Sequence, residues 1–226
     1  MERLSVLMAA ALCLAGVTAQ ASTDLLGPGV NNGSFEEPYL GGVDGAYVQQ
    51  VPPSWKRSDD PDIIIQVHGG AFHEVASDGA QFMVTGVGGV GSNQGLYQDE
   101  ETLGYFQANT VYTLTGYGAW TGLNQTGIPE LQMRLGTSTA AEGAYVSSLP
   151  ADAPVFTFTA FPTITVDTSV DLGLVGSPIV VMLYTNAVDP YPRFDHFALT
   201  ATAVPEPMAL ALLGLGGLLP VLRRRR

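Results

Sequence analysis

The feature that most constrains the fold is the way glycine and proline interrupt this chain. They recur about every ten to fifteen residues, and the segments between them are rich in Val, Ile, Thr, Tyr and Phe. These residue types favour strands, whereas Gly and Pro mark turns. Nine short segments are therefore predicted strands: 46–51, 62–68, 81–85, 110–120, 130–135, 155–161, 163–168, 178–185 and 193–204.

Two of these segments alternate between their two faces. Leu131, Met133 and Leu135 share one face of the fifth segment, and Phe197, Leu199 and Ala201 share one face of the last. Alternation of this kind is typical of half-buried antiparallel strands. No stretch between 22 and 203 shows a helical apolar stripe. We therefore predict an all-β domain, a single antiparallel β-sandwich of the jelly-roll type.

The N-terminal residues 1–21 are typical of a secretory signal peptide. Arg3 precedes an apolar run over 4–17, and Ala19-Gln20-Ala21 is a cleavage site. The one cysteine, Cys13, lies inside this segment. The mature chain therefore cannot use disulfides, thiol catalysis or thiolate metal sites.

The other end combines a short motif, an apolar segment and a basic tail. Pro205-Glu206-Pro207 precedes the uncharged segment 208–222, and four arginines occupy 223–226. As a helix, 208–222 would span only about 22 Å, below the ~30 Å of a bilayer core. A basic cluster after an apolar helix stays on the cytoplasmic side. The segment is thus a short anchor, suited to temporary membrane insertion.

The residues 204–226 resemble the PEP-CTERM sorting signal of Gram-negative bacteria. In that family the enzyme exosortase recognises the Pro-Glu-Pro motif and processes the tail. The resemblance implies that Pro205, Glu206 and Pro207 are sorting residues and that exosortase and the export machinery are partners. It places the precursor in the inner membrane, and the final protein at the cell surface or in the extracellular polysaccharide matrix. The alternative is an ordinary tail anchor.

The predicted domain 22–203 is strongly acidic. Without the two ends, four basic residues face nineteen acidic ones, for a net charge near −15. Such a charge excludes nucleic acid and anionic membrane as partners of the domain. It is compatible with calcium, neutral sugars or cationic partners, or with solubility alone. The 182 residues suffice for one domain.

Three short motifs carry a second resemblance. They are Asn32-Gly33-Ser34-Phe35-Glu36, Asp78-Gly79-Ala80-Gln81-Phe82 and Phe194-Asp195-His196-Phe197. Together they look like the galactose-binding-domain-like jelly rolls, which include many carbohydrate-binding modules. The last motif departs from the pattern, since Phe197 stands where Val is usual.

This resemblance implies a structural calcium ion held by Glu36 and Asp195. Calcium prefers six to eight oxygen ligands, and carboxylates from the first and last strands would join the two ends of the domain. The alternative is that both are ordinary carboxylates at strand edges.

Aromatic side chains near loops could stack on sugar rings. Trp120 ends a predicted strand and runs into a polar loop with Asn124 and Gln125, whose amides could bind hydroxyls. These three residues form the predicted glycan site, although Trp120 could equally be a core residue. For Trp55 the core interpretation is favoured.

No motif in the mature chain predicts catalysis. Gly86–Gly91 matches a dinucleotide-binding pattern, but turn residues follow it where a helix is required. His68, His73 and His196 lack zinc-site spacing. Neither a nucleophile elbow nor a pair of facing carboxylates can be identified. We therefore predict that the domain is not an enzyme.

Three functions remain. The favoured one is an exported, non-catalytic surface or matrix protein that binds glycan or exopolysaccharide. The second is a structural matrix protein without a specific ligand. The third, least favoured, is a hydrolase that acts on glycans.

Overall fold

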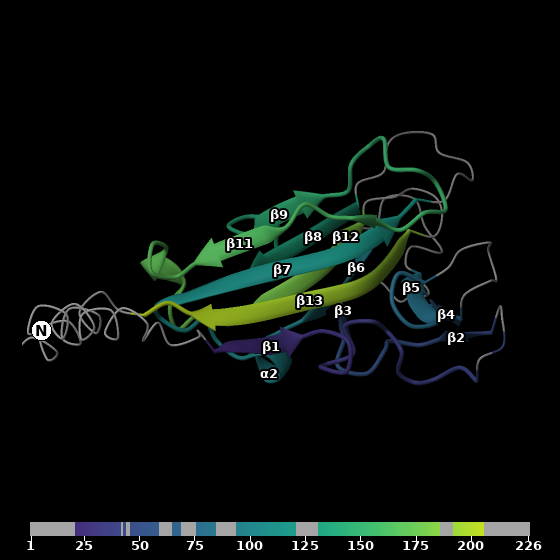
Figure 1. The fold of residues 1–226 in the computed structure, drawn as a ribbon, viewed down its shortest axis with the longest axis horizontal. Helices are drawn as coiled ribbons and strands as arrows, with labels where there is room; N and C mark the ends of the chain where they lie inside the picture. Colours follow the sequence, from purple (N-terminus) through teal and green to yellow (C-terminus); the bar gives the residue numbers. More distant parts are fainter. Residues whose placement is uncertain are drawn as a thin grey trace, which may run out of the picture.

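The computed structural model describes residues 21–41, 43, 46–58, 76–84, 94–120, 131–185 and 192–205, together with the backbone of 65–68. They form two antiparallel sheets (Figure 1). The larger has the order β10 (Thr159–Ala160), β7 (Thr110–Ala119), β13 (Arg193–Ala203), β5 (Gln81–Val84), β4 (Ile65–His68) and β2 (Tyr47–Gln49). In addition, β1 (Ser22–Leu26) pairs with β13, and β11 (Ile164–Asp167) pairs with β7.

The smaller sheet has the order β3 (Lys56–Arg57), β6 (Gln94–Gln98), β12 (Val180–Thr185), β8 (Leu131–Gly136) and β9 (Tyr145–Ser148). Two short helices complete the described elements, α2 (Glu100–Leu103) and the 3₁₀ turn η1 (Leu172–Leu174). The predicted all-β, antiparallel fold is confirmed. The jelly-roll connectivity of the strands stays a prediction. The predicted signal peptide and the segment 208–222 lie outside the described residues.

Each of the nine predicted strands overlaps a strand of the structure, and β1, β3, β6 and β9 were missed. β6 shows why. Gln94 and Gly95 have the composition of a turn, yet they pair with Thr185 and Tyr184 of β12. The ladder of the neighbouring strand therefore overrides local propensity.

One hydrophobic core lies between the sheets. It receives side chains from both: Tyr112, Leu114, Phe197 and Leu199 from the larger sheet, and Leu96, Leu131, Met133, Leu135 and Leu183 from the smaller. All nine are at most 1% exposed. The faces predicted from alternation in 130–135 and 193–204 are therefore confirmed, with Ala201 packed at the edge of the core.

A β-bulge in β13 determines where its side chains point. The register with β7 shifts between Asp195 and Ala198, and His196 has a φ of 51°. Phe194 and Phe197 are an odd number of residues apart, and yet both are fully buried in the core. The extra residue of a bulge makes this possible. Asp195, the last residue before the register shift, contacts the segment 77–81.

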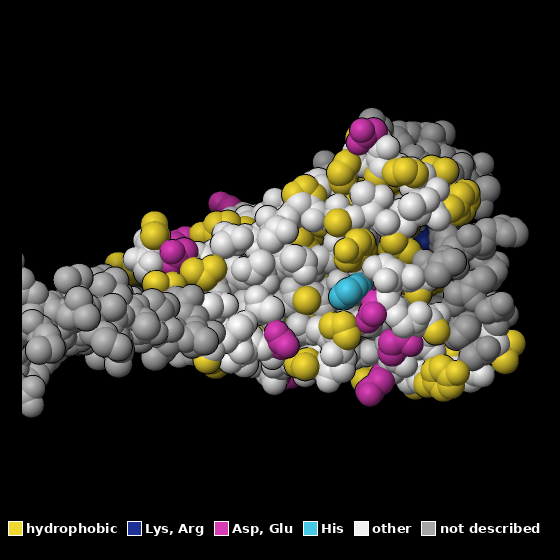
Figure 2. All heavy atoms as spheres, in the orientation of Figure 1, with side chains coloured by type: hydrophobic (Ala, Val, Ile, Leu, Met, Phe, Trp, Pro, Cys, Tyr) yellow, Lys and Arg dark blue, Asp and Glu magenta, His cyan; other side chains and the backbone are white. Residues whose placement is uncertain are grey.

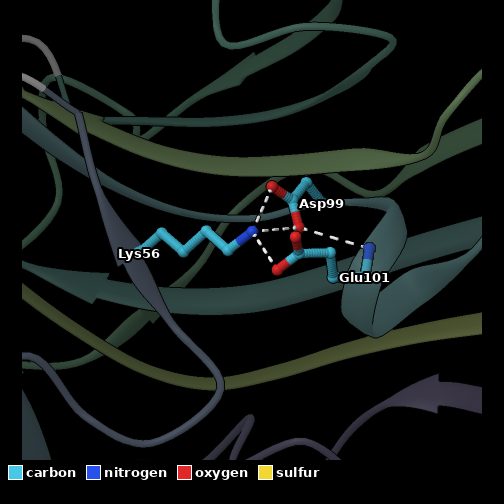
Figure 3. Close-up of polar contacts among 3 residues, drawn as sticks. All are labelled: Lys56, Asp99 and Glu101. Carbon is cyan, nitrogen blue, oxygen red and sulfur yellow. Dashed lines mark hydrogen bonds and ion pairs between the residues drawn. The ribbon is translucent and has the colours of Figure 1, made fainter.

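A cluster of charged side chains links the smaller sheet to α2 (Figure 3). The Lys56 ammonium contacts the Asp99 carboxylate at 2.7 Å and the Glu101 carboxylate at 2.6 Å. Both carboxylates raise the pKa of Lys56 well above its ordinary value. Asp99 also caps α2, since its carboxylate accepts the Glu101 amide hydrogen.

The two ends of the sandwich differ. Ser22 of β1 and Ala203 of β13 lie at the same end, as Figure 1 shows at its left side. We call this the proximal end and define it by the loops 104–109 and 168–179 that surround it. The Val204 amide donates to the Asn109 carbonyl, and the Thr168 amide donates to the Thr110 carbonyl. The opposite, distal end holds Ala119 and Arg193.

Candidate functional site

Glu36 and Asp195 meet through one loop, the segment 77–81. Asp195 Oδ2 accepts hydrogen bonds from the amides of Ser77 at 2.6 Å and Asp78 at 3.0 Å. Glu36 Oε1 accepts from the amides of Ala80 at 2.9 Å and Gln81 at 2.8 Å. Carboxylates from the first loop and the last strand thus hold the same segment by its backbone.

Gly79 lies at the centre of this arrangement. Its φ is +62°, and a Cβ added there would collide with the Glu36 carboxylate. Only glycine combines the left-handed backbone with the space that Glu36 occupies.

Two more side chains complete the cluster. The Ser34 hydroxyl donates to Asp78 Oδ2 at 2.7 Å. The Gln81 side-chain amide donates to the carbonyls of Phe35 and Pro38 and accepts from the Leu40 amide. We call Ser34, Glu36, Asp78, Gln81 and Asp195 the acidic junction.

Asp195 is fully buried. Burial raises its pKa to about 8, against the opposing effect of hydrogen bonds from the amides of Asp78, His196 and Ser77. The negative charge of Glu36 raises the pKa further.

A polar pocket opens beside the junction. Its volume is about 200 Å³, and its lining comes from the first loop together with Ser54 and Asp78. The lining residues are Pro28, Gly29, Asn31, Asn32, Ser34, Glu36, Glu37, Ser54 and Asp78. Figure 2 shows acidic side chains gathered on the lower part of the described surface. A pocket lined by three carboxylates suits ligands that bring hydrogen-bond donors or positive charge.

The asparagines in the lining build the pocket wall. Asn32 has a φ of 54°, exchanges hydrogen bonds with the Glu37 backbone and gives its carbonyl to the Trp55 indole. The Asn31 amide donates to the Leu25 carbonyl. These contacts fix the loop that carries Glu36 and Glu37.

Backbone amides occupy the carboxylates that are predicted to hold calcium. Glu36 Oε1 and both Asp195 oxygens accept amide hydrogens. In the described part of the chain, no group of three His, Cys, Asp or Glu side chains is arranged to hold a metal ion. The two predicted ligands are thus brought to one loop, and the ion stays a prediction.

The two tryptophans both lie in the core. Trp120 is 5% exposed, and its indole donates to the Pro150 carbonyl at 3.4 Å. A sugar platform needs an exposed ring, which Trp120 does not present. Asn124 and Gln125 lie outside the described residues. Trp55 is also 5% exposed and packs on Phe35, which confirms its core interpretation.

The histidine motifs and the glycine loop are only partly visible. His196 stacks on Tyr117 at 5.6 Å between ring centroids. The side chains of His68 and His73, like the segment 86–91, lie outside the described residues. Of the sorting motif, Pro205 is described and exposed, whereas Glu206 and Pro207 are not described. No helix among the described residues is long and apolar enough to cross a membrane.

Sequence reasoning missed Ser34, Asp78 and Gln81 as members of the acidic junction around Glu36 and Asp195. All three lie within the quoted motifs of the second resemblance. Their position within these motifs was the sequence signal that could have identified them. Asp78 and Gln81 contact Asp195 and Glu36 through their backbone amides, which the side-chain types do not predict.

No family model and no curated protein matches the sequence. Solved structures do match. A Stig cyclase from Fischerella sp. TAU, in complex with (3Z)-3-(1-methyl-2-pyrrolidinylidene)-3H-indole, is 19% identical, with a TM-score of 0.62 over 82% of this chain and 100% of that one. A cyclase from the same organism, in complex with 4-(1H-indol-3-yl)butan-2-one, gives 18% identity and 0.59 over 78% and 98%.

Carbohydrate-binding modules also match. The xylan-binding domain from Paenibacillus barcinonensis is 16% identical, with a TM-score of 0.48 over 83% of this chain and 100% of that one. We draw no argument from a likeness this loose.

The cyclases correct the prediction that the domain is not an enzyme. That prediction was based on the lack of a recognisable catalytic motif in the sequence. Catalysts have this fold, so the fold gives no ground for excluding a reaction. At this identity the likeness shows a common fold and leaves activity to be argued from the site.

Proposed function

We propose that the protein acts outside the cytoplasm, at the cell surface or in a polysaccharide matrix, and binds a glycan at the polar pocket. The observation that carries this proposal is the lining of that pocket, where Glu36, Glu37 and Asp78 surround about 200 Å³. Sugar hydroxyls donate hydrogen bonds, and carboxylates accept them more strongly than neutral groups do. The volume is below the ~300–1,000 Å³ of pockets for drug-sized ligands, so one sugar unit would enter.

An exposed aromatic ring follows the pocket in sequence. Tyr39 comes two residues after Glu37, and 67% of its surface is exposed. Aromatic rings in contact with ligands supply apolar area without many rotatable bonds. Tyr39 would cover the sugar face while the carboxylates bind its hydroxyls.

Titration calorimetry with the polysaccharide of the producing organism tests this proposal. Tyr39→Ala and Glu37→Gln should each weaken binding about tenfold, equivalent to about 1.4 kcal/mol. Tyr47→Ala is the matched control, because Tyr47 is 64% exposed but lies on the edge strand β2, whose residues do not line the pocket, whereas Tyr39 follows the lining residue Glu37 by two positions. Equal losses in all three variants, or none in the first two, would contradict a site at the pocket.

The same samples should be analysed for new products after long incubation. If the ligand is recovered unchanged, the pocket binds it without catalysing a reaction. Conversion that Glu37→Gln abolishes would make the pocket a catalytic site, a role that the cyclase fold accommodates.

We further propose that the chain is sorted through Pro205, Glu206 and Pro207 by an exosortase, from a precursor anchored in the inner membrane of a Gram-negative bacterium. Support comes from the position of Pro205, which is exposed and two residues beyond the end of β13. Intact mass of the surface form tests this: residues 208–226 should be absent. Glu206→Ala, or deletion of 223–226, should leave the precursor unprocessed.

Calcium bound by Glu36 and Asp195 is the third proposal. Two carboxylates reach one loop with one of them fully buried, and a divalent cation would offset their repulsion. Its test is given in the Discussion.

A further inference from the structure

The proximal end exposes apolar side chains on well-formed turns. Val170 is 81% exposed and Leu172 is 68% exposed, with Tyr105 at 52% and Val175 at 40%. Hydrophobic and acidic side chains both appear at the left end in Figure 2. Solvent exposure of this extent is unfavourable for four large apolar residues grouped in two adjoining loops.

Backbone contacts hold these two loops together. Tyr105 forms a bridge with Pro178, and the amide of Gly176 donates to the Phe106 carbonyl. The Tyr145 hydroxyl donates to the Asp171 carboxylate, next to Leu172. The exposed side chains are therefore presented by a fixed surface.

The chain leaves the sandwich at this same end. Val204 is bonded to Asn109 there, and only residues 204–207 separate Ala203 from the apolar segment that begins at Met208. An extended chain spans at most ~3.3–3.6 Å per residue, so four residues reach about 14 Å. Once 208–222 is inserted, the proximal end must lie within this distance of the lipid headgroups.

We infer that the proximal end docks on the lipid surface while the tail is in the membrane, with Val170 and Leu172 in the headgroup layer. This inference rests on the proposed membrane insertion of the tail. A few apolar side chains bind lipid weakly on their own, but a short tether raises their effective concentration to about the millimolar range. Docking therefore ends when the tail is cut.

The charge of this end selects the type of lipid. Asp167, Asp171 and Glu142 lie on or beside the two loops. The sequence of 104–109, 137–144 and 167–179 contains no Lys or Arg. The surface should therefore bind zwitterionic lipid and be repelled by anionic lipid.

The test uses the exported chain with its tail intact, which has no cysteine once the signal peptide is removed. Leu172→Cys and Val155→Cys each carry an environment-sensitive fluorophore in phosphatidylcholine vesicles that contain a lipid-borne quencher. Val155 is the matched control, because it is 50% exposed and pairs with Trp120 beyond the distal end of β7. Quenching at position 172 should be at least about threefold greater, as expected for interfacial insertion.

Four outcomes decide the inference. Equal quenching at both positions in chains that float with the vesicles would overturn docking and leave tail insertion standing. Failure to float would overturn both. A fluorescence shift at position 172 without quenching would indicate that protein covers this surface and would overturn the lipid assignment. Weaker quenching at 172 when phosphatidylglycerol is added would support docking as described.

A second variant tests the side chains themselves. With the fluorophore at Tyr105→Cys, the double change Val170→Ser and Leu172→Ser should lower quenching at least about twofold, because interfacial binding scales with buried apolar area. Both residues are exposed, so an unchanged circular-dichroism melt is expected. Unaltered quenching would overturn the assignment to these two residues.

Discussion

At the scale of single residues, the surroundings of Asp195 shift its pKa in opposing directions. Burial and the charge of Glu36 favour its neutral form, whereas amide donors from Ser77, Asp78 and His196 favour the carboxylate. Burial dominates, and the pKa is raised to about 8. Without a cation, the folded protein therefore binds more protons at this position than the unfolded chain does.

This difference predicts a pH dependence of stability in metal-free buffer. Because the pKa is higher in the folded state, the contribution of Asp195 is fully present below its ordinary pKa of 3.8 and is lost as pH rises toward about 8. Between these values the free energy of unfolding should fall by about 1.4 kcal/mol per pH unit.

Urea unfolding from pH 5 to 8 measures this change, with Asp195→Asn as control. The variant cannot ionise at position 195, so its stability should vary less across the range. Parallel curves for the two proteins would show that Asp195 stays charged when folded.

The junction also shows how far sequence predicts a site. Glu36 and Asp195 could be paired through a resemblance, and the structure does bring them to one loop. Their contacts with 77–81 could not be predicted, because any residue offers the same backbone amide. Trp120 shows the converse. A tryptophan at this position in the sequence could be a sugar-stacking residue or a core residue, and its burial in the fold shows that it is a core residue.

At the scale of elements, α2 depends on two roles of Asp99. It accepts the Glu101 amide hydrogen as the N-cap, and it pairs with Lys56. The acidic run 99–101 therefore begins a helix. Long strands with clear alternation could be predicted, but β3 and β9 are fixed by their partners β6 and β8.

Three variants separate the two roles of Asp99. Asp99→Ala removes cap and ion pair, and loss of an N-cap costs about 1 kcal/mol. In a domain of this size that lowers the Tm by about 2–4 °C. Asp99→Ser keeps a capping oxygen, and Glu101→Gln removes charge alone, so both should melt closer to the wild type. A Tm loss in Asp99→Ser equal to that of Asp99→Ala would contradict the importance of the cap.

At the scale of the whole molecule, the first loop and the last strand close the sandwich. The Phe197 amide donates to the Gly33 carbonyl, next to the contacts of Glu36 and Asp195. No disulfide within the chain can make this closure, because the sequence has a single cysteine, Cys13. An ion at the junction would therefore affect global stability.

The calcium proposal predicts a rise in Tm. An ion that binds only the folded state at a hundredfold excess over its Kd stabilises it by about 2.7 kcal/mol, or about 5–10 °C for this size of domain. Differential scanning calorimetry with calcium and with chelator measures the effect, and Glu36→Gln should reduce it. A Tm that chelator leaves unchanged would exclude a structural calcium ion.

The nine-pair register between β7 and β13 has a mechanical consequence. A ligand held near the distal end, with the tail anchored beyond Ala203, would pull along β13 and load its hydrogen bonds with β7 in parallel. Bonds loaded together in shear resist far better than bonds opened one by one. Force between Ser22 and Ala203, by contrast, acts at the same end and would peel β1 from β13 pair by pair. The sandwich would thus resist tension between a ligand at the distal end and an anchored tail, and would yield to force applied between Ser22 and Ala203.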